Sequence, residues 1–280
     1  MEMNKQTNLK SLYSPDGSML HQSQMDLLFL LKKFDKLCSE NGIQYFLDGG
    51  TLLGAVRHHG FIPWDDDIDI LLFPEDYKKL KKVCKSNIEY PFVLHTQESD
   101  FNYPFVYPKF RNENCPSGSS NPERAKYYKY NGVGIDVFHT QQTNTFVAKI
   151  CNGLYFRWIM SVSYKINNRI LRYLYTRSLQ FILLNILFPL LNLPIRLFGN
   201  NNEFHFALGT PWTRRKMFKD KFFPAKMCKF EDAEFPIPND SDLYLKMAYG
   251  NYMELPSQED ILATIHNAQY KTEILNRLSK

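Results

Sequence analysis

The chain has 280 residues, of which 44% are hydrophobic and 22% charged, as in ordinary globular proteins of one or two domains. Its five cysteines are scattered, odd in number and form no C-x-x-C pair, which argues against a zinc site or a disulfide framework and fits a reducing compartment. The net charge is +5, yet residues 141–200 hold seven basic and no acidic residues, leaving 27 basic and 29 acidic elsewhere. No recognition motif accompanies this basic segment, so we expect no nucleic-acid partner.

The N-terminal part is expected to begin with a loosely ordered leader, residues 1–22, which has no signal-peptide core and so argues against secretion. A helix is predicted from a cap at Ser23 to Glu40, because apolar residues recur at helical spacing. Asn41-Gly42 would end this helix.

A predicted strand-turn-helix unit follows. Apolar residues 43–47 predict a strand, Gly49-Gly50 a tight turn, and residues 51–58 a helix. Glycines in such a turn let backbone N–H groups approach a phosphate, and a helix N-terminus favours the anion. Alone, a Gly-Gly pair is more often a plain tight turn than a phosphate site.

The run Trp64-Asp65-Asp66-Asp67-Ile68-Asp69-Ile70 is the most informative stretch. On a strand, Asp67 and Asp69 would share one face with their Cβ atoms roughly 6–7 Å apart, close enough to grip a divalent cation. Oxygen ligands favour Mg²⁺ or Mn²⁺. Asp65 shares that parity and Asp66 does not. The competing interpretation is an acidic surface turn.

Further along, residues 74–85 predict a helix, residues 105–111 and 133–138 predict strands, and residues 112–122 predict a loop. Asp136 lies between apolar neighbours on the second strand, where a buried carboxylate needs a partner. A metal shared with the acidic pair would supply one, and the alternative is a strand end in water. The preceding Gly132-x-Gly134 is expected to leave room for a nucleotide.

Residues 145–198 are predicted to be helical and apolar. The run 181–193 is interrupted by Asn185, Pro189 and Asn192 and is shorter than the roughly 17–25 residues of a membrane span, so we do not expect it to cross a membrane. Two interpretations stay open: a helical lobe packed on the rest of the protein, or a basic, aromatic-rich lobe lying on an anionic membrane. A later basic cluster would bind an anionic acceptor or form a solvated helix face: Arg214, Arg215, Lys216, Lys219 and Lys221.

The stretch from Gly49 to Ile70 resembles the signature of the LicD family, which includes phosphocholine transferases and is related to the fukutin-type transferases. Sixteen residues separate Gly50 from Asp67, the long spacing of that family. Residues 132–138, Phe230-Glu231 and 249–256 extend the similarity, which covers about Leu27 to Pro256.

The resemblance implies an α+β fold: a nucleotidyltransferase (DNA polymerase β-like) mixed sheet flanked by helices, with an added mostly helical lobe. The expected domains are a leader (1–22), a catalytic core (23–140), a basic helical lobe (141–229) and a C-terminal helical segment packing on the core (230–280). It also implies a cytoplasmic enzyme, peripheral at the inner face of the membrane if the lobe binds lipid.

The implied reaction moves a phosphorylated head group, phosphocholine foremost, from a CDP-linked donor such as CDP-choline to a sugar hydroxyl of a glycan or glycolipid. Asp67, Asp69 and Asp136 would be the catalytic and metal-binding residues. The residues expected to contact the phosphates are Gly49, Gly50, Thr51, Arg57 and Lys109. Two alternatives use other chemistry: a nucleotidyltransferase that moves NMP onto a small molecule or protein, and a non-catalytic membrane-associated scaffold.

Overall fold

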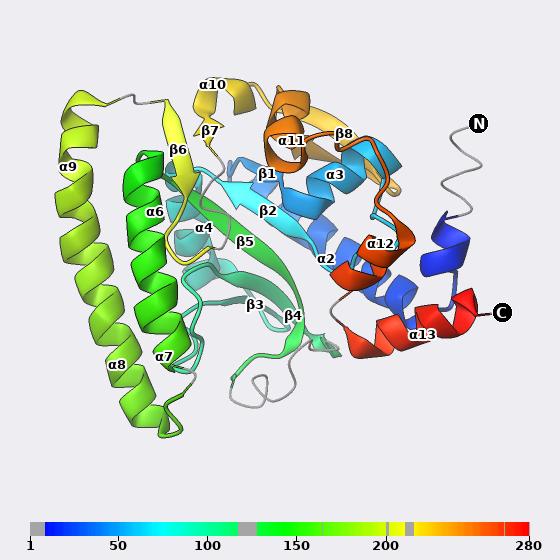
Figure 1. Cartoon of the computed structure of the whole chain (residues 1–280), viewed down its shortest axis with the longest axis horizontal. Helices are drawn as coiled ribbons and strands as arrows, with labels where there is room; N and C mark the ends of the chain where they lie inside the picture. Colours follow the sequence, from blue (N-terminus) through cyan, green and yellow to red (C-terminus); the bar gives the residue numbers. More distant parts are fainter. Residues whose placement is uncertain are drawn as a thin grey trace.

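The computed structural model describes residues 9–116, 128–163, 165–199, 202–210, 216–265 and 267–279. These residues form an α+β structure in which helices flank a curled, seven-stranded mixed sheet, so the expected fold class is confirmed at that level (Figure 1). Helices α6, α8 and α9 stand along one side of the sheet in this view, and α11 to α13 gather on the other side.

One long strand organises the sheet. The main strand order is β1 (Tyr45–Leu47), β2 (Asp69–Leu72), β5 (Gly132–Gln142), β4 (Lys109–Pro116) and β3 (Phe92–His95). Only β2 and β5 run parallel in this set. The far end of β5 also pairs with β6 (Glu203–Phe206), which pairs with β7 (Met217–Phe218). A separate hairpin joins β8 (Lys226–Phe230) and β9 (Ala233–Ile237).

The first long helix, α2 (Met19–Glu40), begins earlier than predicted. Ser18, not Ser23, is its cap: the Ser18 hydroxyl accepts a hydrogen bond from the amide of His21. The leader is therefore partly packed, and Tyr13 is buried with its ring 5.3 Å from that of Trp64. Residues 1–8 lie outside the described residues.

Helix α2 covers the apolar face of the sheet, where Phe34 packs edge-on against Tyr45 and Phe110. Helices α3 (Gly49–His58) and α4 (Pro74–Asn87) match the predicted helices closely.

Two strand boundaries differ from expectation. β2 begins only at Asp69, so Asp67 lies in the extended segment that precedes the strand. β4 covers 109–116, not the predicted 105–111, and so takes in the start of the segment expected to be a loop, because its pairing with β5 resumes at Pro116 after a register shift. The rest of that expected loop, 117–122, lies outside the described residues.

The segment 145–198 is helical, as predicted. It contains α6 (Thr145–Leu154), the π-helical turn η1 (Tyr155–Met160), α7 (Ser161–Ser163), α8 (Arg169–Ile182), the π-helical turn η2 (Leu183–Leu187) and α9 (Phe188–Phe198). Around Tyr155 and Leu183 it has a hydrophobic cluster separate from the main core.

Pro189 interrupts the apolar run of the sequence but does not end the helix. Pro189 falls in the first turn of α9, directly after η2, where its missing N–H is tolerated. The result is one 29-residue apolar helix from Ile170 to Phe198, which is long enough to cross a membrane by length and composition alone.

The remaining helices are α10 (Lys219–Phe222), α11 (Ser241–Tyr249), α12 (Gln258–Thr264) and α13 (Ala268–Leu278). Part of the predicted basic cluster, Arg214 and Arg215, lies outside the described residues. Of the rest, Lys216 lies 3.9 Å from Glu203, and Lys219 lies 3.9 Å from Glu75.

Candidate active site at the junction of β2 and β5

Polar residues occupy one register row across four strands. Asp69 of β2 is the direct partner of Asp136 on β5, Asp136 is opposite Lys109 on β4, and Lys109 is opposite His95 on β3. Residues directly opposite in a sheet point to the same face, and neighbouring strands lie about 4.8 Å apart. The predicted placement of Asp136 on a strand beside the acidic pair is therefore what the structure contains.

The acidic run adds two further carboxyls. The carboxyls of Asp65 and Asp67 are close enough to interact, and each changes the pKa of the other. Burial and the neighbouring charge of Asp67 hold the pKa of Asp65 well above its usual range. Asp67 is an exposed residue, yet desolvation of its carboxyl by the surrounding protein atoms and the charge of Asp136 raise its pKa to about 6. Asp65 thus belongs to the cluster, as its parity predicted.

Asp69 lies at the centre of this negative charge. It is buried, and desolvation raises its pKa first, followed by repulsion from Asp67 and Asp136. The buried carboxylate of Asp48, which we did not predict, adds to the repulsion. Tyr244 on α11 donates a hydrogen bond to Asp48 over 2.7 Å. The Asp directly before the Gly-Gly pair is the signal that could have identified Asp48.

The Gly-Gly pair at the start of α3 makes room for these carboxylates. A Cβ on Gly49 would lie 2.5 Å from Asp69 Oδ2, and one on Gly50 would lie 2.5 Å from Asp65 Oδ2. Gly49 also has a φ of +55°, which side chains disfavour. Thr51 completes the unit, since its hydroxyl accepts a hydrogen bond from the amide of Asp69 over 2.9 Å. Two carboxylates thus sit against a helix N-terminus, which favours negative charge.

The structure brings Lys109 into the site and turns Arg57 elsewhere. The ammonium of Lys109 forms an ion pair with Asp136 Oδ1 and lowers the pKa of Asp67. Arg57 lies at the far end of α3, where its guanidinium donates to the carbonyls of Tyr252 (2.7 Å) and Glu254 (3.2 Å). Arg57 therefore binds the C-terminal segment, and these donors point away from the carboxylates.

Other contacts fix the loop that carries the acidic run. Gln24 on α2 donates to the carbonyl of Asp65 over 2.8 Å. Glu231 accepts from the amide of Phe61 over 3.0 Å, and its own amide donates to the carbonyl of His59. The motif at 230–231 thus braces the loop between α3 and β2, while 249–256 contacts Arg57 at the end of α3.

The glycines that precede Asp136 serve the sheet. A Cβ on Gly132 would lie 2.1 Å from the carbonyl oxygen of Asn112, and one on Gly134 would lie 2.9 Å from the side chain of Arg111. The expected space for a nucleotide is therefore filled by β4, whose register with β5 shifts between Asn112 and Pro116.

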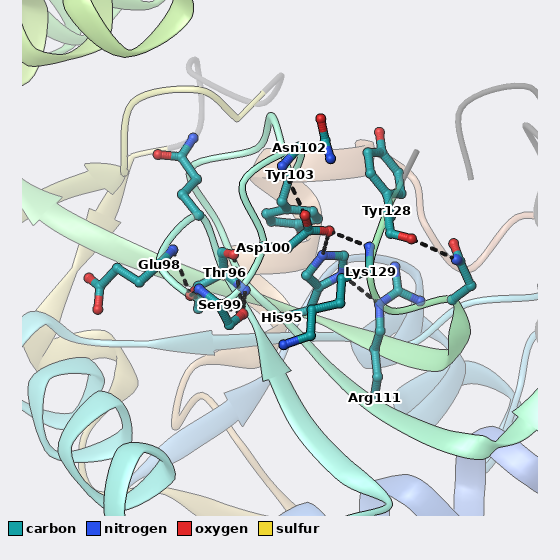
Figure 2. A network of polar contacts seen from close by, with 12 residues as sticks. His95, Thr96, Glu98, Ser99, Asp100, Asn102, Tyr103, Arg111, Tyr128 and Lys129 are labelled. Carbon is teal, nitrogen blue, oxygen red and sulfur yellow. Dashed lines mark hydrogen bonds and ion pairs between the residues drawn. The ribbon is translucent and has the colours of Figure 1, made fainter. Parts of the chain in front are cut away.

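A buried polar network continues the row beyond Lys109 (Figure 2). The ring of His95 lies between two partners: Asp100 Oδ2 is 2.9 Å from Nε2, and Arg111 Nε donates to Nδ1 over 3.0 Å. Asp100 also accepts hydrogen bonds from the amides of Asn102 and Lys129. Burial, then the charge of Arg111, lowers the pKa of His95 to about 4, so the ring is neutral at pH 7.

Sequence reasoning missed this network, because its members come from separate segments of no distinctive pattern. The one available indication was that Lys109 and Arg111 lie two residues apart on one strand and so share a face of the sheet.

The side chains that the structure describes near Asp69 have the right chemistry for a divalent cation but are not arranged around one. Across the parts of the chain that the structure describes, no group of three or more His, Cys, Asp or Glu side chains is arranged to hold a metal ion. Asp136 is instead engaged by the ammonium of Lys109. The donor chemistry nevertheless fits Mg²⁺ or Mn²⁺: the donors are carboxylate oxygens only, and their raised pKa values show a charge density that a hard cation would relieve.

Comparison with known proteins gives this cluster a context. Residues 42–166 match the family described as LicD/FKTN/FKRP, nucleotidyltransferase domain. They include all the clustered carboxylates, which we call the carboxylate row: Asp48, Asp65, Asp67, Asp69 and Asp136. The chain is similar to the lipopolysaccharide cholinephosphotransferase LicD of Haemophilus influenzae, with 25% identity over 260 residues that cover 86% of this chain and 94% of that protein.

Two shorter similarities accompany it. Human ribitol 5-phosphate transferase FKRP is 54% identical over 35 residues, which are 12% of this chain and 7% of that protein. An uncharacterized protein of Rickettsia prowazekii is 34% identical over 98 residues, which are 28% of this chain and 37% of that protein.

Proposed function

We propose that this chain, which carries a LicD-family domain and is a phosphotransferase, moves a phosphorylated head group from a CDP-linked donor onto a hydroxyl of a cell-surface glycan. Phosphocholine is the head group we favour, because the relative matched over 86% of this chain is a cholinephosphotransferase. We further propose that the sheet is a nucleotidyltransferase sheet, with β2 and β5 carrying its carboxylates.

The observation that carries the proposal is the crowding of carboxylates. Asp67 and Asp69 have raised pKa values, and each is repelled by Asp136. A folded protein holds like charges together only when something offsets the repulsion, and a divalent cation with a phosphate ligand does so. A scaffold without chemistry would have no use for such an arrangement.

We assign the cation, Mg²⁺ or Mn²⁺, to Asp67, Asp69 and Asp136. When bound, it would neutralise charge on the transferred phosphorus and on the departing CMP. Lys109 would then exchange its contact with Asp136 for one with a donor phosphate, because its ammonium already lies at the carboxylate row. Gly49, Gly50 and Thr51 would hold the donor's phosphates near the start of α3.

The proposed step is a substitution at the phosphorus that carries choline. The acceptor oxygen attacks the phosphorus that carries choline, a new P–O bond forms, the bond from that phosphorus to the bridging oxygen breaks, and CMP leaves with the electron pair. The hydroxyl proton passes to a carboxylate, and Asp136 is our candidate because the move of Lys109 to the donor phosphate frees Asp136 Oδ1 to accept it. Arg57 has no part in this step, since its guanidinium binds the carbonyls of Tyr252 and Glu254.

We place the reaction in a reducing compartment, the cytoplasm. All five cysteines are free in the structure, and Cys38 and Cys151 are buried. Their burial as thiols suits a cell interior better than an oxidising exterior.

The test measures CMP release from CDP-choline, CDP-ribitol and CDP-glycerol, with Mg²⁺, with Mn²⁺ and with chelator. We expect cation-dependent release from one of these donors, and a loss of at least about a hundredfold in Asp67→Asn, the scale of a major electrostatic stabiliser.

Asp66→Asn is the matched control. It lies in the same acidic run but outside the assigned ligands, and it should stay within about threefold of the natural protein, as expected for removing a charge outside the reacting centre. Nucleotide left on the acceptor, without CMP release, would show nucleotidyl transfer instead. Equal turnover in Asp67→Asn and the natural protein would remove the metal assignment.

A further inference from the structure

We infer that the protein docks on an anionic membrane through the outer face of its helical lobe. We define this outer face as the exposed side chains of α6, η1 and the continuous helix α8–η2–α9. In Figure 1 this long helix forms one edge of the molecule, with α6 between it and the sheet. The inference rests on the exposure, polarity and charge of the lobe alone and is independent of the donor and acceptor.

The first observation is the character of the exposed side chains. Ten large apolar residues between 170 and 198 are exposed, among them Leu174 (54%), Phe181 (61%), Leu190 (64%) and Leu197 (63%). They recur at three- and four-residue spacing and so form a stripe along one side of the helix. Monomeric soluble proteins rarely expose a continuous apolar stripe of this kind.

The opposite side of the same helix faces inward, and beside apolar residues such as Leu183 it carries polar side chains. Arg177 donates to the carbonyl of Gln97 over 3.2 Å, Gln180 donates to that of Pro104 over 3.3 Å, and Asn192 donates to that of Gln142 over 2.8 Å. Gln180 and Asn192 are both only 3% exposed. Rolling the helix to bury its apolar stripe would break these buried bonds, so the stripe is held outward.

The same contacts decide how the helix lies against a bilayer. They tie it to the body of the protein near residue 177 and again at residue 192, over most of its length. A helix of 29 residues spans about 43 Å, more than the roughly 30 Å of a hydrocarbon core. Crossing the bilayer would carry the attached sheet into the lipid, so the helix lies in the plane of the interface, with its stripe about 5–10 Å deep.

Charge selects the occupant. Residues 141–200 contain no acidic residue, and six basic residues besides the inward-facing Arg177. On the α6–η1 side, the exposed Lys149 and Arg157 lie in sequence beside the exposed Phe146 and Trp158. Anionic headgroups match this pattern. A second copy of the chain would bring basic side chains against one another with no acidic partner from this segment, which costs stability in a twofold interface.

The test is co-sedimentation of the full chain with vesicles of phosphatidylcholine alone or with added phosphatidylglycerol. We expect binding to the anionic vesicles at low salt and a sharp loss of binding as salt is added. Lys149→Gln with Arg157→Gln, which alters exposed residues only, should weaken binding by up to about thirtyfold, since each basic residue near the surface contributes about 1 kcal/mol.

Leu174→Asp with Leu190→Asp should abolish binding at any salt concentration. The matched control is Leu275→Asp on α13, which is 44% exposed but lies outside the lobe, and it should bind like the natural protein. Thermal unfolding without vesicles checks that each variant folds.

Two results would overturn the inference: no binding to anionic vesicles at low salt, or undiminished binding by the Leu174→Asp, Leu190→Asp protein. A dimer in solution that this pair of substitutions dissociates, with no vesicle binding, would assign the face to self-association instead.

Discussion

The carboxylate row and the outer face of the lobe both place side chains in unfavourable surroundings: charged groups close together in one, and apolar groups exposed to water in the other. At the row, Asp67 and Asp69 are crowded so closely that desolvation and repulsion raise their pKa values. On the lobe, Leu190 and Leu197 point outward while Gln180 and Asn192 are buried. Both arrangements cost free energy in the isolated chain. The contrast indicates two different external partners, a charged ligand for one region and an apolar, anionic surface for the other.

The largest effect we expect on stability separates the two faces of the long helix. Leu183 and Leu190 lie seven residues apart, but Leu183 is 5% exposed and Leu190 is 64% exposed. Leu183→Ala should cost about 2–5 kcal/mol of unfolding free energy, because it leaves a cavity in the lobe's hydrophobic cluster. Leu190→Ala should change it by less than about 0.5 kcal/mol. Denaturant unfolding of both variants measures the difference, and equal losses would mean that the outer face is part of a folded interior.

A smaller effect comes from the polar network beside the site, and it depends on pH. Burial and Arg111 lower the pKa of His95 to about 4 in the folded protein, compared with 6.5 in the unfolded chain. The folded state then binds fewer protons, so the contribution of His95 is complete above pH 6.5 and decreases as the pH falls toward 4. Between pH 6.5 and pH 5, the titration of His95 should lower the free energy of unfolding by about 2 kcal/mol.

The measurement is denaturant unfolding at pH 7, 6 and 5 for the natural protein and for His95→Asn. Burial also lowers the pKa values of His58, to about 4, and His139, to about 3, so both proteins should lose stability on acidification. The variant starts less stable but should lose less. A variant as acid-sensitive as the natural protein would show that His95 does not titrate in this range.

Sequence reasoning succeeded where local patterns determine structure. Alternation between apolar and acidic residues placed Asp69 and Asp136 on strands, the family resemblance implied that these strands are neighbours, and helical spacing identified the lobe. It failed where remote partners decide. The sequence around Arg57 does not indicate that its guanidinium binds the backbone at 252 and 254. The sequence around Gly134 likewise does not indicate that the side chain of Arg111 fills the space beside it.

The outer face shows the same limit. The sequence contained the apolar run, but the inward polar contacts of Arg177, Gln180 and Asn192 decide which side of the helix faces out. Those contacts join residues 50 to 80 positions apart, beyond the reach of local periodicity.

The most direct test of the central claim, that the crowded carboxylates exist to bind a divalent cation, is thermal unfolding of the natural protein and Asp69→Asn with and without Mn²⁺. Without the cation, Asp69→Asn should unfold at the same or a higher temperature, because one repelling charge is gone. With Mn²⁺, the natural protein should gain stability as a bound ligand requires, and the variant should gain much less. Equal shifts in both proteins, or none in the natural protein, would contradict the claim.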